Sequence, residues 1–228
     1  MVKPDECLAE GAKVLSALIQ AVESKHMSFP PGGLKGLKGL VLIHSKKGAL
    51  GVGYETGSGV AINVGYNDDG SIYTSGPVPL KLSKLTVGVQ LGFNNVFTMM
   101  AVYHYSQMEK LLSSAGAIVG KDINVAGLPY QHDNNIQNSK QITSITPLSG
   151  NADATQQDIK VITVSDSYMV CDFSLYGGSL GVDKALLDEM YGGGVEAKDV
   201  LGGKVPTPEA FKGAVDAISS TFTKLANM

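Results

Sequence analysis

Closely spaced glycines in residues 51–59, GVGYETGSG, form the first pattern with a possible chemical role, because glycine-rich loops can hold phosphate groups against backbone amides. Such a loop needs a strand before the glycines and a helix after them. Here the alternation of Val60, Ile62 and Val64 predicts another strand after them. Glycines in tightly coiled strands therefore explain this segment better than a nucleotide site does.

Other catalytic patterns are equally weak. Ser58 lies in Gly-Ser-Gly, which lacks the spacing of a nucleophile elbow. The four histidines occur in unrelated contexts, and no pair of Cys or His residues has the spacing of metal ligands. Cys7 and Cys171 lie far apart in the chain, and we do not expect a disulfide between them. The sequence therefore predicts no enzyme, no metal ion and no cofactor.

Lysine residues give the clearest chemical signal. All 18 basic residues are Lys, and the formal net charge is −3. Between Glu23 and Glu55 there are no acids but five lysines, and Lys81 and Lys84 follow in a second acid-free stretch. A long block of one sign often attracts an anionic partner, although a solvated surface is the alternative interpretation. Without arginine forks or interleaved aromatic residues, nucleic acid is a poorer candidate than a membrane.

We therefore predict non-catalytic binding of anionic membrane lipid, with phosphoinositide as the expected headgroup. The candidate lipid-binding residues carry the positive charge of the N-terminal region: Lys13, Lys25, Lys35, Lys38, Lys46 and Lys47. An actin-binding cytoskeletal or endocytic protein is the alternative. The N-terminal residues lack the apolar region of a signal peptide, so we expect a cytoplasmic protein. No apolar run approaches the ~18 residues of a membrane span, so any membrane association should be peripheral.

The elements that position these lysines indicate one α+β domain over residues 1–228. Residues 5–25 have the apolar stripe of a helix, which either packs on a core or inserts Leu and Ile side chains into lipid. Residues 34–181 predict a strand-rich core, a glycine-rich antiparallel β-barrel or sandwich, with a polar loop at 129–158. Residues 183–226 predict C-terminal helices, the last one amphipathic. Within the core we expect a turn at 45–48 and a break between two strands at Asn94-Asn95.

Six segments, taken in order, resemble the SYLF domain family over residues 8–222. The segments are FPPGGLKGLKGLVLI, GVGYETGSGVAINV, VGVQLGFNNVFTMMAV, VGKDINVAGLP, ITVSDSYMVCDFSLYGGSL and EMYGGGVEAKDVL. The resemblance implies a lipid-binding domain that in fungal and animal members also binds actin. The chain departs from the family pattern in places: Tyr73 replaces a Trp, and 168–172 lacks the usual basic residue.

Overall fold

The computed structural model describes residues 2–29, 32–113, 116–124, 142–147, 159–167 and 171–228. In these ranges the helices and strands follow one another in this order: α1 (Pro4–Glu23), β1 (Gly39–Tyr66), β2 (Ile72–Thr74), β3 (Val78–Val102), α2 (Tyr105–Ser113), β4 (Gly116–Asn124), β5 (Ile142–Pro147), β6 (Ile159–Ser167), β7 (Cys171–Val182), α3 (Lys184–Tyr191), α4 (Ala197–Leu201) and α5 (Glu209–Ala226).

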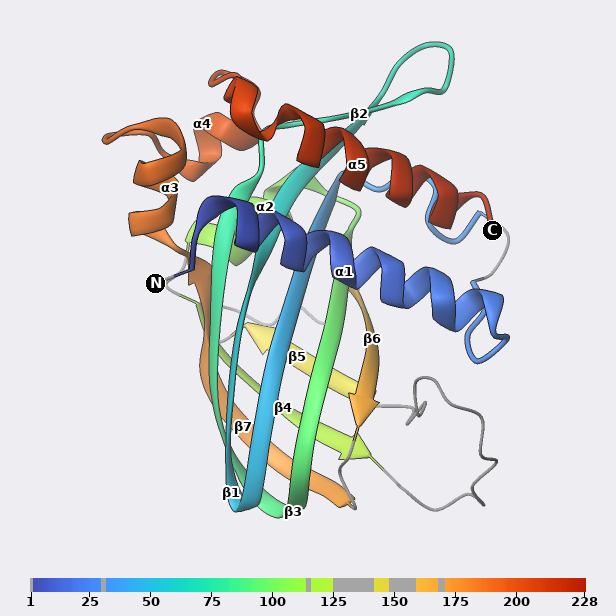
Figure 1. Ribbon diagram of the computed structural model, residues 1–228, viewed down its shortest axis with the longest axis vertical. Helices are drawn as coiled ribbons and strands as arrows, with labels where there is room; N and C mark the ends of the chain where they lie inside the picture. Colours follow the sequence, from blue (N-terminus) through green and yellow to red (C-terminus); the bar gives the residue numbers. More distant parts are fainter. Residues whose placement is uncertain (1, 30–31, 114–115, 125–141, 148–158, 168–170) are drawn as a thin grey trace.

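The terminal helices α1 and α5 lie side by side across one end of the sheet, while the long strands extend away from them (Figure 1). Pro4 begins α1, and Asp5 and Glu6 in its first turn suit the positive end of the helix dipole. The stripe of α1 is buried, including Leu8, Leu15 and Leu18. Its apolar side chains therefore serve the core, and insertion of this helix into lipid is ruled out for the folded protein.

Seven strands of the described chain form one antiparallel sheet in the order β2-β1-β3-β7-β4-β5, with β6 also paired to β3. The long strands β1 and β3 pair with each other from Gly39↔Val102 to Ala61↔Val78. The sheet has two ends and is not closed. The mixed α+β architecture with terminal helices is confirmed, whereas the barrel or sandwich geometry is not.

The β1–β3 ribbon folds back on itself at the end farthest from α1 and α5 (Figure 1). The pairing shifts register between Leu50 and Val52, and the intervening Gly51 has a φ of 74°, a conformation that favours glycine. The bend divides the ribbon into a first arm, residues 39–50 with 91–102, and a second arm, residues 52–61 with 78–87. The two arms approach closely, since a Cβ on Gly59 would lie 1.8 Å from the carbonyl oxygen of Leu42. Glycine is thus required both at the bend and where the arms meet.

An apolar core fills the space between the helices and the near part of the ribbon. Side chains from α1, β1, β3 and α5 meet there, among them Leu15, Leu42, Ile62, Met99 and Phe222, each 0% exposed. A second cluster behind the sheet joins β1 and β3 to α2, α3 and α4 through residues such as Val41, Met100 and Leu187. The buried stripe of α5 confirms its predicted amphipathic packing.

Two local predictions inside the strand-rich core are wrong. Residues 45–48 do not form a turn but continue β1, and Asn94-Asn95 does not separate two strands but lies within β3. In both places polar side chains of a strand point into the protein, where sequence patterns lead one to expect apolar residues. Most of the predicted loop at 129–158 lies outside the described residues, except β5. The extent of the single domain stays a prediction.

No helix in the described ranges has both the length and the apolar character needed to cross a membrane.

Candidate functional site

The six candidate lysines do not share one exposed surface. Lys25 and Lys35 are exposed and lie in the connection between α1 and β1, whereas Lys46 is exposed on the first arm of β1. Lys13 is exposed on α1, but its ammonium group bonds to the carboxylate of Glu10 at 2.8 Å. The charge of Lys13 is therefore largely compensated within the protein.

Two of the candidates are withdrawn from the surface. Lys38 is half-buried, with its ammonium 5.7 Å from the ring centre of Tyr66 and 5.8 Å from that of Tyr105. These distances are typical of cation–π contacts, which place the charge against the aromatic rings. Lys47 is only 1% exposed, because it lies on the inner face of the folded ribbon. A buried ammonium cannot reach a leaflet, so Lys47 adds no charge to an exposed binding surface.

Lys47 belongs to a polar interior at the far end of the ribbon. We call residues 45–56 of β1 and 83–94 of β3 the strand tip. Inside it, Glu55 and Lys84 form an ion pair at 3.2 Å, with side chains 1% and 4% exposed. The Ser45 hydroxyl donates to Glu55 at 2.5 Å. The buried pair therefore has the additional hydrogen bond that such pairs need when they are removed from water.

Further hydrogen bonds continue this interior toward the bend. The Thr86 hydroxyl donates to the side-chain oxygen of Gln90 at 2.9 Å, and the Gln90 amide donates to the Gly51 carbonyl at 3.1 Å. Both side chains are buried. Gly53 leaves room for them, since a Cβ there would lie 2.4 Å from the Thr86 hydroxyl. The inner face of the strand tip is thus packed with polar groups.

The outer faces of the strand tip are apolar. Leu50 is 80% exposed and Phe93 is 73% exposed on the first arm, and Leu91 pairs with Leu50 across the strands. On the second arm, Val52, Val87 and Leu175 of β7 are register partners, and Tyr54 pairs with Leu85; all are exposed. Monomeric proteins rarely expose large contiguous apolar patches, so such a patch usually marks an interaction site.

Positive charge accompanies this apolar surface. The only acid in β1 and β3 is Glu55, which is buried, whereas these strands contain four lysines: Lys46, Lys47, Lys81 and Lys84. Lys46 and Lys81 are exposed, one on each arm. Within the described part of the chain, neither is within ion-pair distance of a carboxylate. The outer faces of the two long strands therefore carry positive charge and no negative charge.

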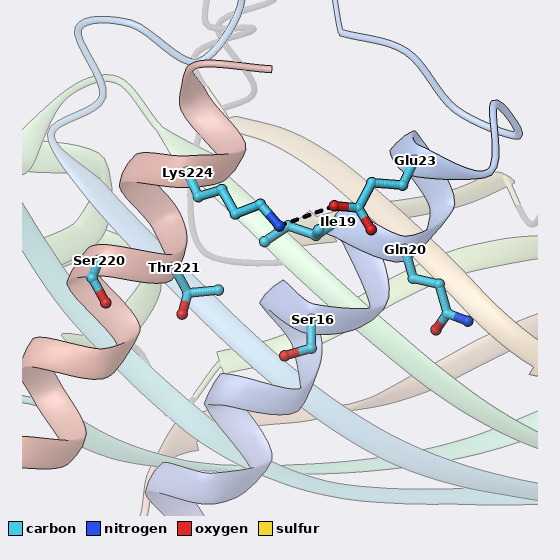
Figure 2. Close-up of a pocket in the computed structure, with 7 residues that line it drawn as sticks. All are labelled: Ser16, Ile19, Gln20, Glu23, Ser220, Thr221 and Lys224. Atoms are coloured by element: carbon cyan, nitrogen blue, oxygen red, sulfur yellow. Dashed lines mark hydrogen bonds and ion pairs between the residues drawn. The ribbon is translucent and has the colours of Figure 1, made fainter.

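A groove of about 660 Å³ between α1 and α5 is the other candidate site (Figure 2). An ion pair at 2.9 Å between Lys224 and Glu23 crosses it. The hydroxyls of Ser16 and Thr221 bond to carbonyl groups of their own helices. Its polar groups thus serve the helices themselves, and we interpret the groove as the seam where the two helices pack.

The titratable side chains between α1 and the sheet have hydrogen-bond partners within the protein. Glu10 of α1 contacts His44 of β1, whose ring stacks on Phe97 with centroids 4.5 Å apart. Burial acts to raise the pKa of Glu10, but hydrogen bonds from Lys13 and His44 outweigh it, so that the pKa is lowered from its ordinary value of 4.5. Together these contacts tie α1 to the sheet.

The free thiol of Cys7 donates to the Gly59 carbonyl at 3.0 Å, and burial raises its pKa to about 12. A thiol with such a pKa is not a nucleophile at neutral pH. Among the described residues, no group of three His, Cys, Asp or Glu side chains is placed to hold a metal ion.

Sequence patterns did not identify the apolar strand tip or the position of Lys81 beside it. A signal existed: Leu50, Val52 and Tyr54 occur at every second position, separated by Gly51 and Gly53. The alternation predicts a strand with two unlike faces, but it does not say which face is turned inward. Only the fold shows that the polar face is inside.

A helix-flanked antiparallel sheet with an exposed apolar and basic end places this chain among the mixed α+β proteins. The family model of the Las17-binding protein actin regulators, Ysc84, matches residues 83–221. The chain therefore belongs to this family, and the predicted SYLF resemblance is confirmed. The matched residues run from β3 through most of α5, so all six candidate lysines lie outside them. Comparisons with curated proteins and with solved structures found no match.

Proposed function

We propose that this protein binds anionic membrane lipid without catalysing a reaction. One observation carries the proposal: the exposed charges of the two long strands are positive, and they adjoin an exposed apolar surface. A lysine near an anionic leaflet contributes ~1 kcal/mol, and this contribution falls off within a Debye length. Lys46 in the strand tip and Lys81, two residues before its β3 segment, supply this attraction, and Lys25 and Lys35 form a second exposed pair near the end of α1.

Headgroup selectivity should be weak. Lysine ammonium groups act as point charges and lack the rigid fork with which arginine recognises phosphate. Phosphoinositide is the preferred headgroup in our proposal because it carries the highest charge, not because a shaped pocket recognises it. Vesicles with phosphatidylserine at matched total charge therefore bind comparably, and a strong preference for one phosphoinositide isomer would contradict this part of the proposal.

Vesicle co-sedimentation at low and physiological salt tests the proposal. The double variant Lys46→Gln/Lys81→Gln should lose most of the salt-sensitive binding, while Lys25→Gln/Lys35→Gln should lose less if the strand tip faces the membrane. A matched control replaces Lys198, Lys204 and Lys212, which are paired with Glu196, Asp199 and Glu209 respectively. Equal sedimentation with neutral vesicles, or no sedimentation with anionic ones, would refute the proposal.

The family match supports a second candidate function, regulation of actin through direct contact with the filament. Filament co-sedimentation of the whole chain tests it. Binding to filaments at physiological salt would support it. Binding to vesicles alone would leave membrane lipid as the partner of this protein.

A further inference from the structure

The strand tip has the reverse of the usual arrangement of polar and apolar side chains. In an ordinary antiparallel sheet, the face turned to the core is apolar and the face turned to water is polar. Here the inner face holds Glu55, Lys84 and Gln90, whereas the outer face holds Leu50 and Phe93. Strands that contact lipid on their outer side and enclose polar groups show this same alternation. The outer surface of the strand tip is therefore matched to an apolar solvent.

We propose that the strand tip inserts into the hydrocarbon layer of a membrane leaflet, so that its apolar side chains on both arms contact lipid chains. The inserting residues are Leu50, Val52, Tyr54, Leu85, Val87, Leu91, Phe93 and Leu175. This inference rests on the proposed lipid-binding function and specifies its surface, its depth and its orientation. The helices α1 and α5, at the opposite end, then face away from the membrane.

The positions of two lysines agree with insertion into one leaflet. Lys46 precedes Gly51 at the bend by five residues, and Lys81 pairs with Ser58, seven residues after Gly51. At ~3.3 Å per residue, the backbones of these lysines lie ~17 Å and ~23 Å along the strands from the bend. Half of a ~30 Å hydrocarbon core is ~15 Å, and the headgroup region of one leaflet adds ~5–8 Å. Insertion of the tip into one leaflet thus brings a lysine of each arm near the level of the anionic headgroups.

The charge and shape of the surface favour lipid over a second copy of this chain. A twofold interface brings the same surface of two subunits together. Here it would place the lysines of one copy near those of the other. β1 and β3 have no exposed acid to pair with these lysines. Moreover, the apolar residues lie on the outer sides of both arms of the ribbon. A leaflet surrounds an inserted tip on all sides, whereas a single protein partner covers one side.

The chain contains no tryptophan, which permits a direct test. Phe93→Trp places one fluorophore on the strand tip, and Tyr73→Trp places one on β2, toward the opposite end; the parent side chains are 73% and 54% exposed. Each full-length variant is mixed with vesicles of phosphatidylcholine and phosphatidylserine, with or without bromine on the lipid acyl chains. We expect blue-shifted emission from Phe93→Trp and its quenching by the brominated chains, with neither effect for Tyr73→Trp.

Co-sedimentation of the same samples separates the two proposals. Sedimentation with vesicles but no quenching of Phe93→Trp would overturn insertion and leave the proposed lipid binding intact. Absence of sedimentation would overturn both. A blue shift of Phe93→Trp without vesicles, increasing with protein concentration alongside a dimer in analytical ultracentrifugation, would assign the surface to a second copy. A shift caused by actin filaments and not by vesicles would assign it to a filament contact.

A variant with several substitutions at the tip gives an independent result. In Leu50→Ser/Val87→Ser/Phe93→Ser, binding to anionic vesicles at high salt should fall about 100-fold or more, because apolar transfer is insensitive to charge screening. The thermal midpoint should stay unchanged, since all three parent side chains are already exposed. Unchanged binding at high salt would overturn the proposal.

Discussion

The helical end of the molecule and the strand tip are built on the same two strands, yet their interiors are opposite in kind. Near α1 and α5, β1 and β3 bury Leu42, Ile62 and Met99. Beyond the middle of the ribbon, the same strands bury a charged pair, Glu55 and Lys84, and expose large apolar side chains. One strand can thus bury apolar side chains along one half and polar side chains along the other, and the exposed apolar side chains of the tip are the surface that we propose inserts into lipid.

Core packing at the helical end predicts the largest loss of stability. Phe222 of α5 is 0% exposed and contacts the cluster shared by α1 and the sheet. Phe222→Ala should lower the free energy of unfolding by ~3–5 kcal/mol, because a cavity is left in a close-packed core. Chemical denaturation measures this value. A loss below ~1 kcal/mol would mean that α5 does not pack as described.

Glu55→Gln tests the polar interior of the strand tip. It removes the Glu55 carboxylate from its buried ion pair with Lys84, and removal of one partner of a buried pair costs ~3–5 kcal/mol. The double variant Glu55→Leu/Lys84→Met should recover most of this loss, because apolar residues of similar volume often replace buried pairs without a penalty. An unchanged unfolding free energy in the single variant would show that the tip interior is open to water.

The contact between α1 and the sheet predicts a smaller, pH-dependent effect. Because the pKa of Glu10 in the folded protein is below its ordinary value of 4.5, the ionised carboxylate stabilises the fold above that pH. This contribution is lost as the pH falls through the lowered pKa. The stability difference between the parent and Glu10→Gln should therefore be present at neutral pH and disappear in acid. A difference that grows on acidification would contradict the assignment.

Exposed apolar residues of the tip predict the smallest effect on folding. Leu50→Ser and Phe93→Ser should each change the unfolding free energy by no more than ~0.5 kcal/mol, since surface substitutions rarely exceed this value. Phe222→Ala is the matched comparison, an aromatic residue of the opposite end. A loss of several kcal/mol in Phe93→Ser would place that side chain in a core and remove it from the proposed binding surface.

The helices and the α+β class could be predicted from sequence because their signals are local. Apolar residues at helical spacing identified α1 and α5, and Pro4 marked the start of α1. The strand tip could not be predicted in the same way. Its Ser45 and Lys47 were interpreted as a turn, and Asn94 as a break between strands, because strand interiors are usually apolar. Which face of an alternating strand is buried depends on how the ribbon folds, and this is a tertiary property.

The lysine pattern is visible in the sequence, but the spatial arrangement of its side chains is not. The acid-free stretches were visible in the sequence, but burial of Lys47, the Glu10 partner of Lys13 and the aromatic contacts of Lys38 depend on residues far along the chain. Lys81 lies in the second acid-free stretch, and nothing local connects it with Lys46. The fold places them on the two arms of one ribbon.

Vesicle co-sedimentation in high salt tests most directly the claim that the strand tip faces the membrane. The parent chain, the triple serine variant of the tip and the variant Lys25→Gln/Lys35→Gln are compared with anionic vesicles at low and at high salt. We predict that the parent and the Lys25/Lys35 variant retain binding at high salt, while the tip variant binds only at low salt through its remaining lysines. Equal retention of the tip variant and the parent at high salt would contradict the account.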